Sequence, residues 1–212
     1  MYFNMEKFVI DTNFFFNLEI KTGLGNNPKE IIIEFTRLAR QLKTTKKAEF
    51  YMPPSIVDEL LTFVDKDDEY VKNFLELITI KAPDLNSIQL SANVFYQLVK
   101  EARERSYRAM KVAEEIVDQT GNKMMKKAEL SKVEYQQQIG ELITKLRERY
   151  RQATRVKFLD SPADFELIAL AKELNGQLIT SDEGVLIWGR KIGVSEIIPN
   201  LVKDRFNQLI QD

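Results

Sequence analysis

Short apolar runs alternate with segments of helical periodicity at both ends of this chain of 212 residues. The run Lys7–Ile10 stops at Asp11, and the run Glu49–Met52 stops before two prolines, as is typical of buried strands that end in loops. Between them, Asn27-Pro28 opens a helical pattern with proline at the first helical position. Strands that alternate with helices favour a parallel sheet covered on both faces.

The C-terminal part of the chain shows the same alternation. In order, it predicts a helix over Asp164–Leu174, a strand over Gln177–Thr180, a short helix over Gly184–Ile192 and a strand over Glu196–Ile198. The fold class predicted for the two ends together is therefore α/β, a central parallel sheet flanked by helices.

The middle of the chain predicts an inserted long helical hairpin. Apolar residues keep a helical period over Ser91–Thr120 and over Met124–Lys157, with Gly121-Asn122 as the predicted turn. The segment Gln97–Lys157 carries 15 Lys and Arg against 9 Asp and Glu, whereas the rest carries 16 against 23. We therefore expect two bodies, an α/β domain of residues 1–88 and 158–212 and a basic hairpin of residues 89–157.

Two absences limit the chemistry, since the chain has no histidine and no cysteine. They exclude zinc sites built on those residues, disulfides, cysteine nucleophiles and Ser–His triads. Catalysis would have to use carboxylates, hydroxyls, Lys or Arg, and a hard metal ion. The N-terminus has no signal-peptide pattern, and the longest uncharged stretch, Leu85–Val99, is short and partly polar, so we expect a cytoplasmic protein with no membrane segment.

Acidic residues lie where predicted strands end or predicted helices begin. Asp11 follows the first strand, Asp160 and Asp164 flank the start of a helix, and Asp182 follows the strand that ends at Thr180. In a parallel sheet, the carboxyl ends of the strands share one edge, and ligands bind there. Four carboxylates at this edge would form an oxygen-only site suited to Mg²⁺, or to Mn²⁺.

Each of these acids is weighed against a structural role. Ser161-Pro162-Ala163-Asp164 matches a capping box, and Asp182 could cap the helix that follows it. Asp11 has no such role, because no helix is predicted directly after it. Glu59, on the helix after the second strand, is a further catalytic candidate, whereas its neighbour Asp58 is interpreted as a solvated surface residue.

The ordered set of acids resembles that of the PIN-domain nucleases. The residues that carry this resemblance are Asp11-Thr12-Asn13, Glu59, Asp160 with Asp164, and Asp182-Glu183-Gly184. A narrower resemblance, to the protein-only ribonuclease P family known as the homologues of Aquifex RNase P, covers nearly the whole chain. It rests on Ser91–Tyr96, Val112–Glu115, Leu146–Arg151, Asp160–Asp164 and Ser181–Gly184 with Trp188.

The resemblance implies a PIN domain with an inserted helical spike, which removes the 5′ leader from precursor tRNA with a divalent metal and without an RNA subunit. The metal ligands that it implies are Asp11, Asp160, Asp164 and Asp182, with Glu59 as a further catalytic acid. It also implies a homo-oligomer, in which dimers build a larger ring. The family usually has Ser, Thr and Pro where this chain has Asn13, Phe16 and Leu18.

The chemistry predicted for such a site is phosphodiester hydrolysis. A divalent cation held by aspartates lowers the pKa of a bound water, which predicts 5′-phosphate and 3′-hydroxyl ends. The basic hairpin would contact the backbone of a double-helical tRNA arm, although an ordinary solvated face is the alternative. The predicted RNA-binding residues are Arg147, Arg151 and Arg155 on one helix face, Arg149 beside them and Arg108 on the opposing helix.

Two other functions fit the same residues. A PIN-type toxin or general endoribonuclease would use the same acids on another RNA, but such proteins usually lack a long inserted hairpin. A non-catalytic RNA-binding scaffold would give the acids structural roles only, and the intact set of acids argues against it.

Overall fold

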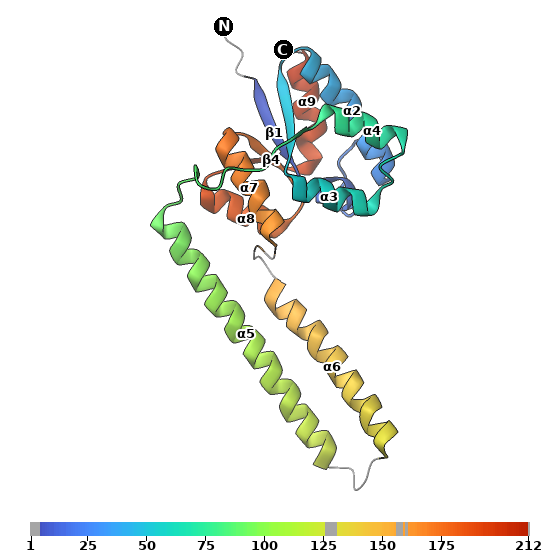
Figure 1. Ribbon diagram of the computed structural model, residues 1–212, viewed down its shortest axis with the longest axis vertical. Helices are drawn as coiled ribbons and strands as arrows, with labels where there is room; N and C mark the ends of the chain where they lie inside the picture. The colour runs from blue at the N-terminus through green and yellow to red at the C-terminus, as the bar shows by residue number, and fades with distance from the viewer. Residues whose placement is uncertain (1–4, 126–130, 156–158, 160, 212) are drawn as a thin grey trace. The chain divides into compact units, whose positions relative to one another are not determined.

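The computed structural model describes residues 5–125, 131–155, 159 and 161–211, without the side chains of residues 123–125 and 155. The chain divides into two compact units (Figure 1). The first, which we call the sheet unit, consists of Met1–Leu90 and Leu159–Asp212. The second, the hairpin unit, consists of Ser91–Phe158.

Among the residues described, five parallel strands form one sheet in the order β3-β2-β1-β4-β5. They are β1 (Glu6–Ile10), β2 (Ala48–Met52), β3 (Thr79–Ile80), β4 (Gln177–Ile179) and β5 (Ser195–Ile197). The predicted α/β class with a parallel sheet is confirmed. The strand order reverses at β1, which pairs with β2 on one side and β4 on the other, and ligands of such sheets bind outside the carboxyl ends of the strands at this point.

Helices cover both faces of the sheet. They are α1 (Asn13–Phe16), α2 (Pro28–Thr44), α3 (Pro54–Phe63), α4 (Glu69–Leu77), α7 (Pro162–Leu174), α8 (Glu183–Ile192) and α9 (Val202–Gln211). Helix α2 packs against α4 and α9, whereas α7 packs against α8 and α3. Figure 1 shows α2 and α9 on one side of the strands and α7 with α8 on the other.

Phenylalanine side chains fill the core between the sheet and the α2–α9 layer. Phe8 of β1 stacks on Phe50 of β2 with 5.6 Å between ring centroids, and Phe206 of α9 lies 5.3 Å from Phe8. Phe35 of α2 contacts Phe50 and Phe206 at 5.7 Å and 5.5 Å. All four rings are fully buried, so each contributes about 1.5–3 kcal/mol of burial free energy to the packing of β1 and β2 against α2 and α9.

The hairpin unit consists of α5 (Ala92–Met125) and α6 (Lys132–Arg155), which lie side by side in Figure 1. The buried part of their contact is apolar and includes Val112, Ile116 and Leu142. The predicted long hairpin is confirmed, but the turn predicted at Gly121-Asn122 is wrong, because α5 runs through both residues. One glycine costs a helix only about 1 kcal/mol, which a long packed helix tolerates.

None of the helices in the described part of the chain is both long enough and apolar enough to cross a membrane.

Candidate active site

Asp11 lies at the carboxyl end of β1, where the apolar run stops. Its side chain is only 2% exposed. The Asp11 backbone N–H donates to the Ile179 carbonyl at the end of β4 (3.0 Å). Its Oδ2 accepts a 2.5 Å hydrogen bond from the Thr180 hydroxyl, and its Oδ1 accepts one from the Asn13 N–H (3.3 Å). Asp11 is therefore fixed between the ends of the two central strands.

Burial makes the ionised form of Asp11 costly. Desolvation raises the pKa of its carboxyl group from 3.8 to about 6, although the hydrogen bonds from Thr180 and Asn13 lower it. The charges of Glu59 and Asp182 raise the same pKa, so both carboxylates act on Asp11. The negative charge at this position is thus uncompensated among the described side chains, and a bound cation would relieve it.

Thr180 connects two of the acids. Its side chain is fully buried, and its hydroxyl donates to Asp11 while it accepts a hydrogen bond from the Asp182 N–H (2.9 Å). Asp182 is the N-cap of α8, where its Oδ1 accepts from the Val185 N–H (2.9 Å). The structural interpretation of Asp182 as a cap is confirmed, and the same cap holds this acid beside Asp11.

Glu59 reaches the site from α3. The Thr12 hydroxyl donates to the Ile56 carbonyl (3.1 Å) and so ties the segment after β1 to the first turn of α3. Glu59 follows one turn later, is half-buried, and has a pKa raised by that burial. Its neighbour Asp58 is exposed, as the sequence interpretation expected.

Asp164 has the predicted capping role at the start of α7. Its Oδ2 accepts from the Ser161 N–H (3.2 Å), and the Ser161 hydroxyl accepts from the Asp164 N–H (3.1 Å). Helix α7 packs against β1, which bears Asp11 at its end. Asp160 lies outside the residues that the structure describes, so its part in the site stays a prediction.

Several hydroxyl groups around the acids were not predicted from the sequence. The Ser181 hydroxyl donates to the Asn13 carbonyl (3.0 Å) and accepts from the Asn17 side chain (3.3 Å), which joins the loops after β4 and β1. The Ser55 hydroxyl donates to Glu166 Oε2 (2.5 Å) and joins α3 to α7. Small hydroxyl residues next to acids at strand ends are the sequence signal for such contacts.

The donor set suits a hard divalent cation. Within the described ranges, no three acidic side chains come together as a metal-binding group. The available donors are all oxygens, and Asp11 is a buried carboxylate with repelling neighbours. Mg²⁺ usually binds through one or two carboxylates and keeps several waters, so the residues present fit this ion.

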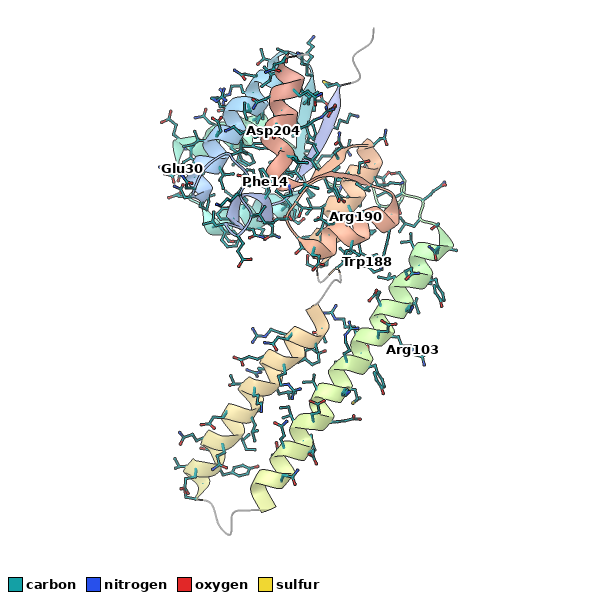
Figure 2. All side chains as sticks on the ribbon, turned by 180° about the vertical axis from the view of Figure 1, so that it is seen from behind. Phe14, Glu30, Arg103, Trp188, Arg190 and Asp204 are labelled. Atoms are coloured by element: carbon teal, nitrogen blue, oxygen red, sulfur yellow. The ribbon has the colours of Figure 1, made fainter. Side chains whose placement is uncertain are left out.

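The predicted RNA-binding arginines fall into two groups. Arg147 and Arg151 of α6 are exposed. Arg149 forms a 2.5 Å ion pair with Glu115, and the Arg108 Nε donates to the Ala153 carbonyl (2.9 Å), so both join α5 to α6. The Arg155 side chain is outside the description. Figure 2 shows a further cation, Arg103, on the side of α5 that faces away from α6.

The parallel sheet with carboxylates at its switch point has the features that the sequence analysis expected of a PIN-type ribonuclease, and the comparisons show this class. The sequence profile of the PINc domain ribonucleases matches residues 7–211. The chain is 37% identical to an RNA-free ribonuclease P of Thermodesulfovibrio yellowstonii, over 93% of this chain and 92% of the relative. Relatives of the same name from Pyrococcus horikoshii (35%, 98% and 94%) and Nitrosococcus oceani (33%, 92% and 91%) are similar over comparable lengths.

The chain therefore belongs to the RNA-free ribonuclease P family of the PINc domain ribonucleases, and the resemblance inferred from its motifs is confirmed.

Proposed function

We propose that this chain is an RNA-free ribonuclease P that hydrolyses precursor tRNA to remove the 5′ leader. The observation that carries the proposal is the extent of the similarity. The relatives named RNA-free ribonuclease P match through the hairpin as well as the sheet unit, over 93% and 98% of this chain in two cases. A general PIN-type nuclease would need only the sheet unit, so the hairpin favours the tRNA-processing function.

In this proposal, the residues that would hold Mg²⁺, or Mn²⁺, are Asp11, Asp160, Asp164 and Asp182. When bound, the cation supplies a coordinated water of lowered pKa and offsets charge on the phosphate oxygens. The buried position of Asp11 and the repulsion that it meets from Glu59 and Asp182 support this role.

The side chains of the protein orient the reaction. Thr180 holds the Asp11 carboxylate by its hydroxyl and holds the Asp182 backbone by accepting its N–H. Glu59, half-buried beside Asp11, accepts the proton that the attacking water loses. The water oxygen bonds to phosphorus and the P–O3′ bond breaks, so the mature tRNA keeps a 5′-phosphate. The departing O3′ takes a proton from solvent, and the leader leaves with a 3′-hydroxyl.

The hairpin unit contributes RNA affinity. Arg147 and Arg151 are exposed and four residues apart on α6, a spacing that places both on one face. We assign phosphate contacts with the tRNA backbone to these two and to Arg155, and a supporting role to Arg108 and Arg149 through their contacts between α5 and α6. Assembly of the chain into homo-oligomers and a cytoplasmic location belong to the same proposal.

One experiment tests the function. The protein is incubated with a precursor tRNA that carries a 5′ extension, with Mg²⁺ or with EDTA, and the cut is mapped. The proposal expects cleavage at the mature 5′ end, and loss of cleavage in Asp160→Asn and in EDTA. Asp58→Asn is the matched control, because Asp58 is exposed. Cleavage elsewhere favours a general endoribonuclease, and binding without cleavage favours a scaffold.

A further inference from the structure

Two phenylalanines outside the core lie against each other next to the candidate active site. Phe16 ends α1 and Phe63 ends α3, with 4.8 Å between their ring centroids and 33° between their planes. Phe63 is 58% exposed, and Phe16 is half-buried. In contrast, the preceding Phe14 and Phe15 are buried among core rings. We call Phe16 and Phe63 the rim pair.

The rim pair is placed by the same two helices that position the acids. Helix α1 begins two residues after Asp11, and α3 carries Glu59. Glu59 and Phe63 are four residues apart, so they share one face of α3. The helices are joined at Thr12 and Ile56, Glu59 acts electrostatically on Asp11, and the rim pair follows at the far end of both helices. The exposed ring is therefore one helical turn beyond a carboxylate of the site.

We propose that the rim pair stacks on the unpaired leader nucleotide that immediately precedes the scissile phosphate, an inference that rests on the proposed function. The first nucleotide of a mature tRNA is paired in the acceptor stem, so the leader supplies the unpaired base nearest to the cut. Proteins hold unpaired bases on aromatic side chains, and this contact tolerates any base because every base has a π-face.

Phenylalanine suits leaders of differing sequence, since its ring presents no hydrogen-bonding group that would select one base. Exposed Leu18, two residues after Phe16, adds apolar surface to the same segment. Exposed Lys21, in the segment that follows α1, supplies positive charge for leader phosphates.

A purely structural role for the rim pair does not explain why the Phe63 ring is exposed. The hydrogen bond from Thr12 to the Ile56 carbonyl already joins the helices, and Phe15 anchors α1 through contacts with Phe35 and Phe74. More than half of the Phe63 surface stays in water, so the pair leaves an apolar ring open at the edge where substrate is proposed to bind.

The test combines a protein change with a matching RNA change. Phe63→Leu keeps apolar bulk but removes the ring, and Ile33→Ala, at an exposed position of α2, is the control. Each protein is assayed in single turnover on two precursor tRNAs, which differ only in whether the last leader nucleotide is normal or abasic. Half-saturating protein concentration and the rate at saturation are measured separately.

We expect Phe63→Leu to raise the half-saturating concentration at least about fivefold on the normal substrate, the lower limit for base–aromatic stacking, and to leave the abasic substrate unaffected. The rate at saturation stays close to that of the wild type, and Ile33→Ala changes neither substrate. Equal losses on both substrates, or no loss on the normal one, overturn the stacking site.

A second readout separates this inference from the proposed function. With 2-aminopurine as the last leader nucleotide and EDTA present, binding of the wild type should quench the fluorescence and binding of Phe63→Leu should quench it less. Wild-type cleavage at the mature 5′ end without this difference would keep the function and overturn the stacking site. If the wild-type protein cuts elsewhere, the proposed function is overturned. The difference in fluorescence quenching between the wild type and Phe63→Leu would then be the test of the stacking site.

Discussion

Replacement of Asp11 by asparagine should stabilise the metal-free protein at pH 8 while it abolishes cleavage. Burial raises the pKa of Asp11 from 3.8 to about 6 in the folded protein, so the folded state binds this proton more tightly than the unfolded state does. The free energy of unfolding therefore falls as the pH rises through the window between 3.8 and about 6. At 1.36 kcal/mol for each pKa unit, the ionised Asp11 costs about 3 kcal/mol above that window.

Asparagine removes this cost at a small penalty. The side-chain oxygen of the new asparagine can still accept from the Thr180 hydroxyl, but its amide nitrogen cannot accept from the Asn13 N–H. The loss of this second hydrogen bond lowers the free energy of unfolding by about 1 kcal/mol. The expected net gain at pH 8 is about 2 kcal/mol. For a protein of this size, this gain corresponds to a rise in Tm of about 4–8 °C.

The assay is thermal unfolding followed by circular dichroism in EDTA, at pH 8 and at pH 4. At pH 4, Asp11 is protonated in the folded wild type, so the variant should have no advantage there. Asp58→Asn, at the exposed neighbour of Glu59, should change neither curve. Mg²⁺ should then raise the Tm of the wild type but not that of Asp11→Asn. An Asp11→Asn protein that is less stable than the wild type by the same amount at both pH values would refute the argument from burial.

Three other changes probe the site and the hairpin. Thr180→Val should weaken Mn²⁺ binding about tenfold in a calorimetric titration, whereas Thr180→Ser, which keeps the hydroxyl, should bind Mn²⁺ like the wild type. Equal Mn²⁺ affinities of the two variants would show that the hydroxyl does not support metal binding. Arg147→Ala/Arg151→Ala should reduce the slope of log affinity against log salt by about 2 for precursor tRNA and leave metal affinity unchanged, and an unaltered slope would exclude these phosphate contacts. Leu142→Ala should destabilise the hairpin by about 2–3 kcal/mol, measured as faster amide exchange in α5 and α6 with the sheet unit unchanged.

The position of Asp11 was predictable because an acid that directly follows a buried apolar run marks the carboxyl end of a strand, the edge where ligands of parallel sheets bind. The pattern of apolar residues also predicted the long helices, because their apolar residues recur with a helical period over many turns. It missed β3, which has only two residues, both exposed, and α1, which has four. Such short elements form because longer neighbours hold them, and they carry no periodicity of their own.

The link between Asp11 and Thr180 could not be predicted, because the two residues are 169 positions apart. It exists because β1 pairs with β4 in a register that aligns Ile10 with Ile179. Conversely, Gly121 was given too much weight as a break, because α5 runs through it and one glycine costs a helix only about 1 kcal/mol. The sequence offered a cap and a metal ligand as competing roles for Asp164 and Asp182; both caps are present, and the ligand roles stay predictions.

The pairing of β1 with β4 also sets when activity can begin during synthesis. Asp11 follows β1, which is synthesised well before its partner strand, Gln177–Ile179. The whole hairpin unit lies between them in the chain. Because Asp182 follows β4, it cannot meet Asp11 until β4 has left the ribosome and paired with β1. We therefore expect a nascent chain to be a poor nuclease towards nearby RNA until β4 has been added.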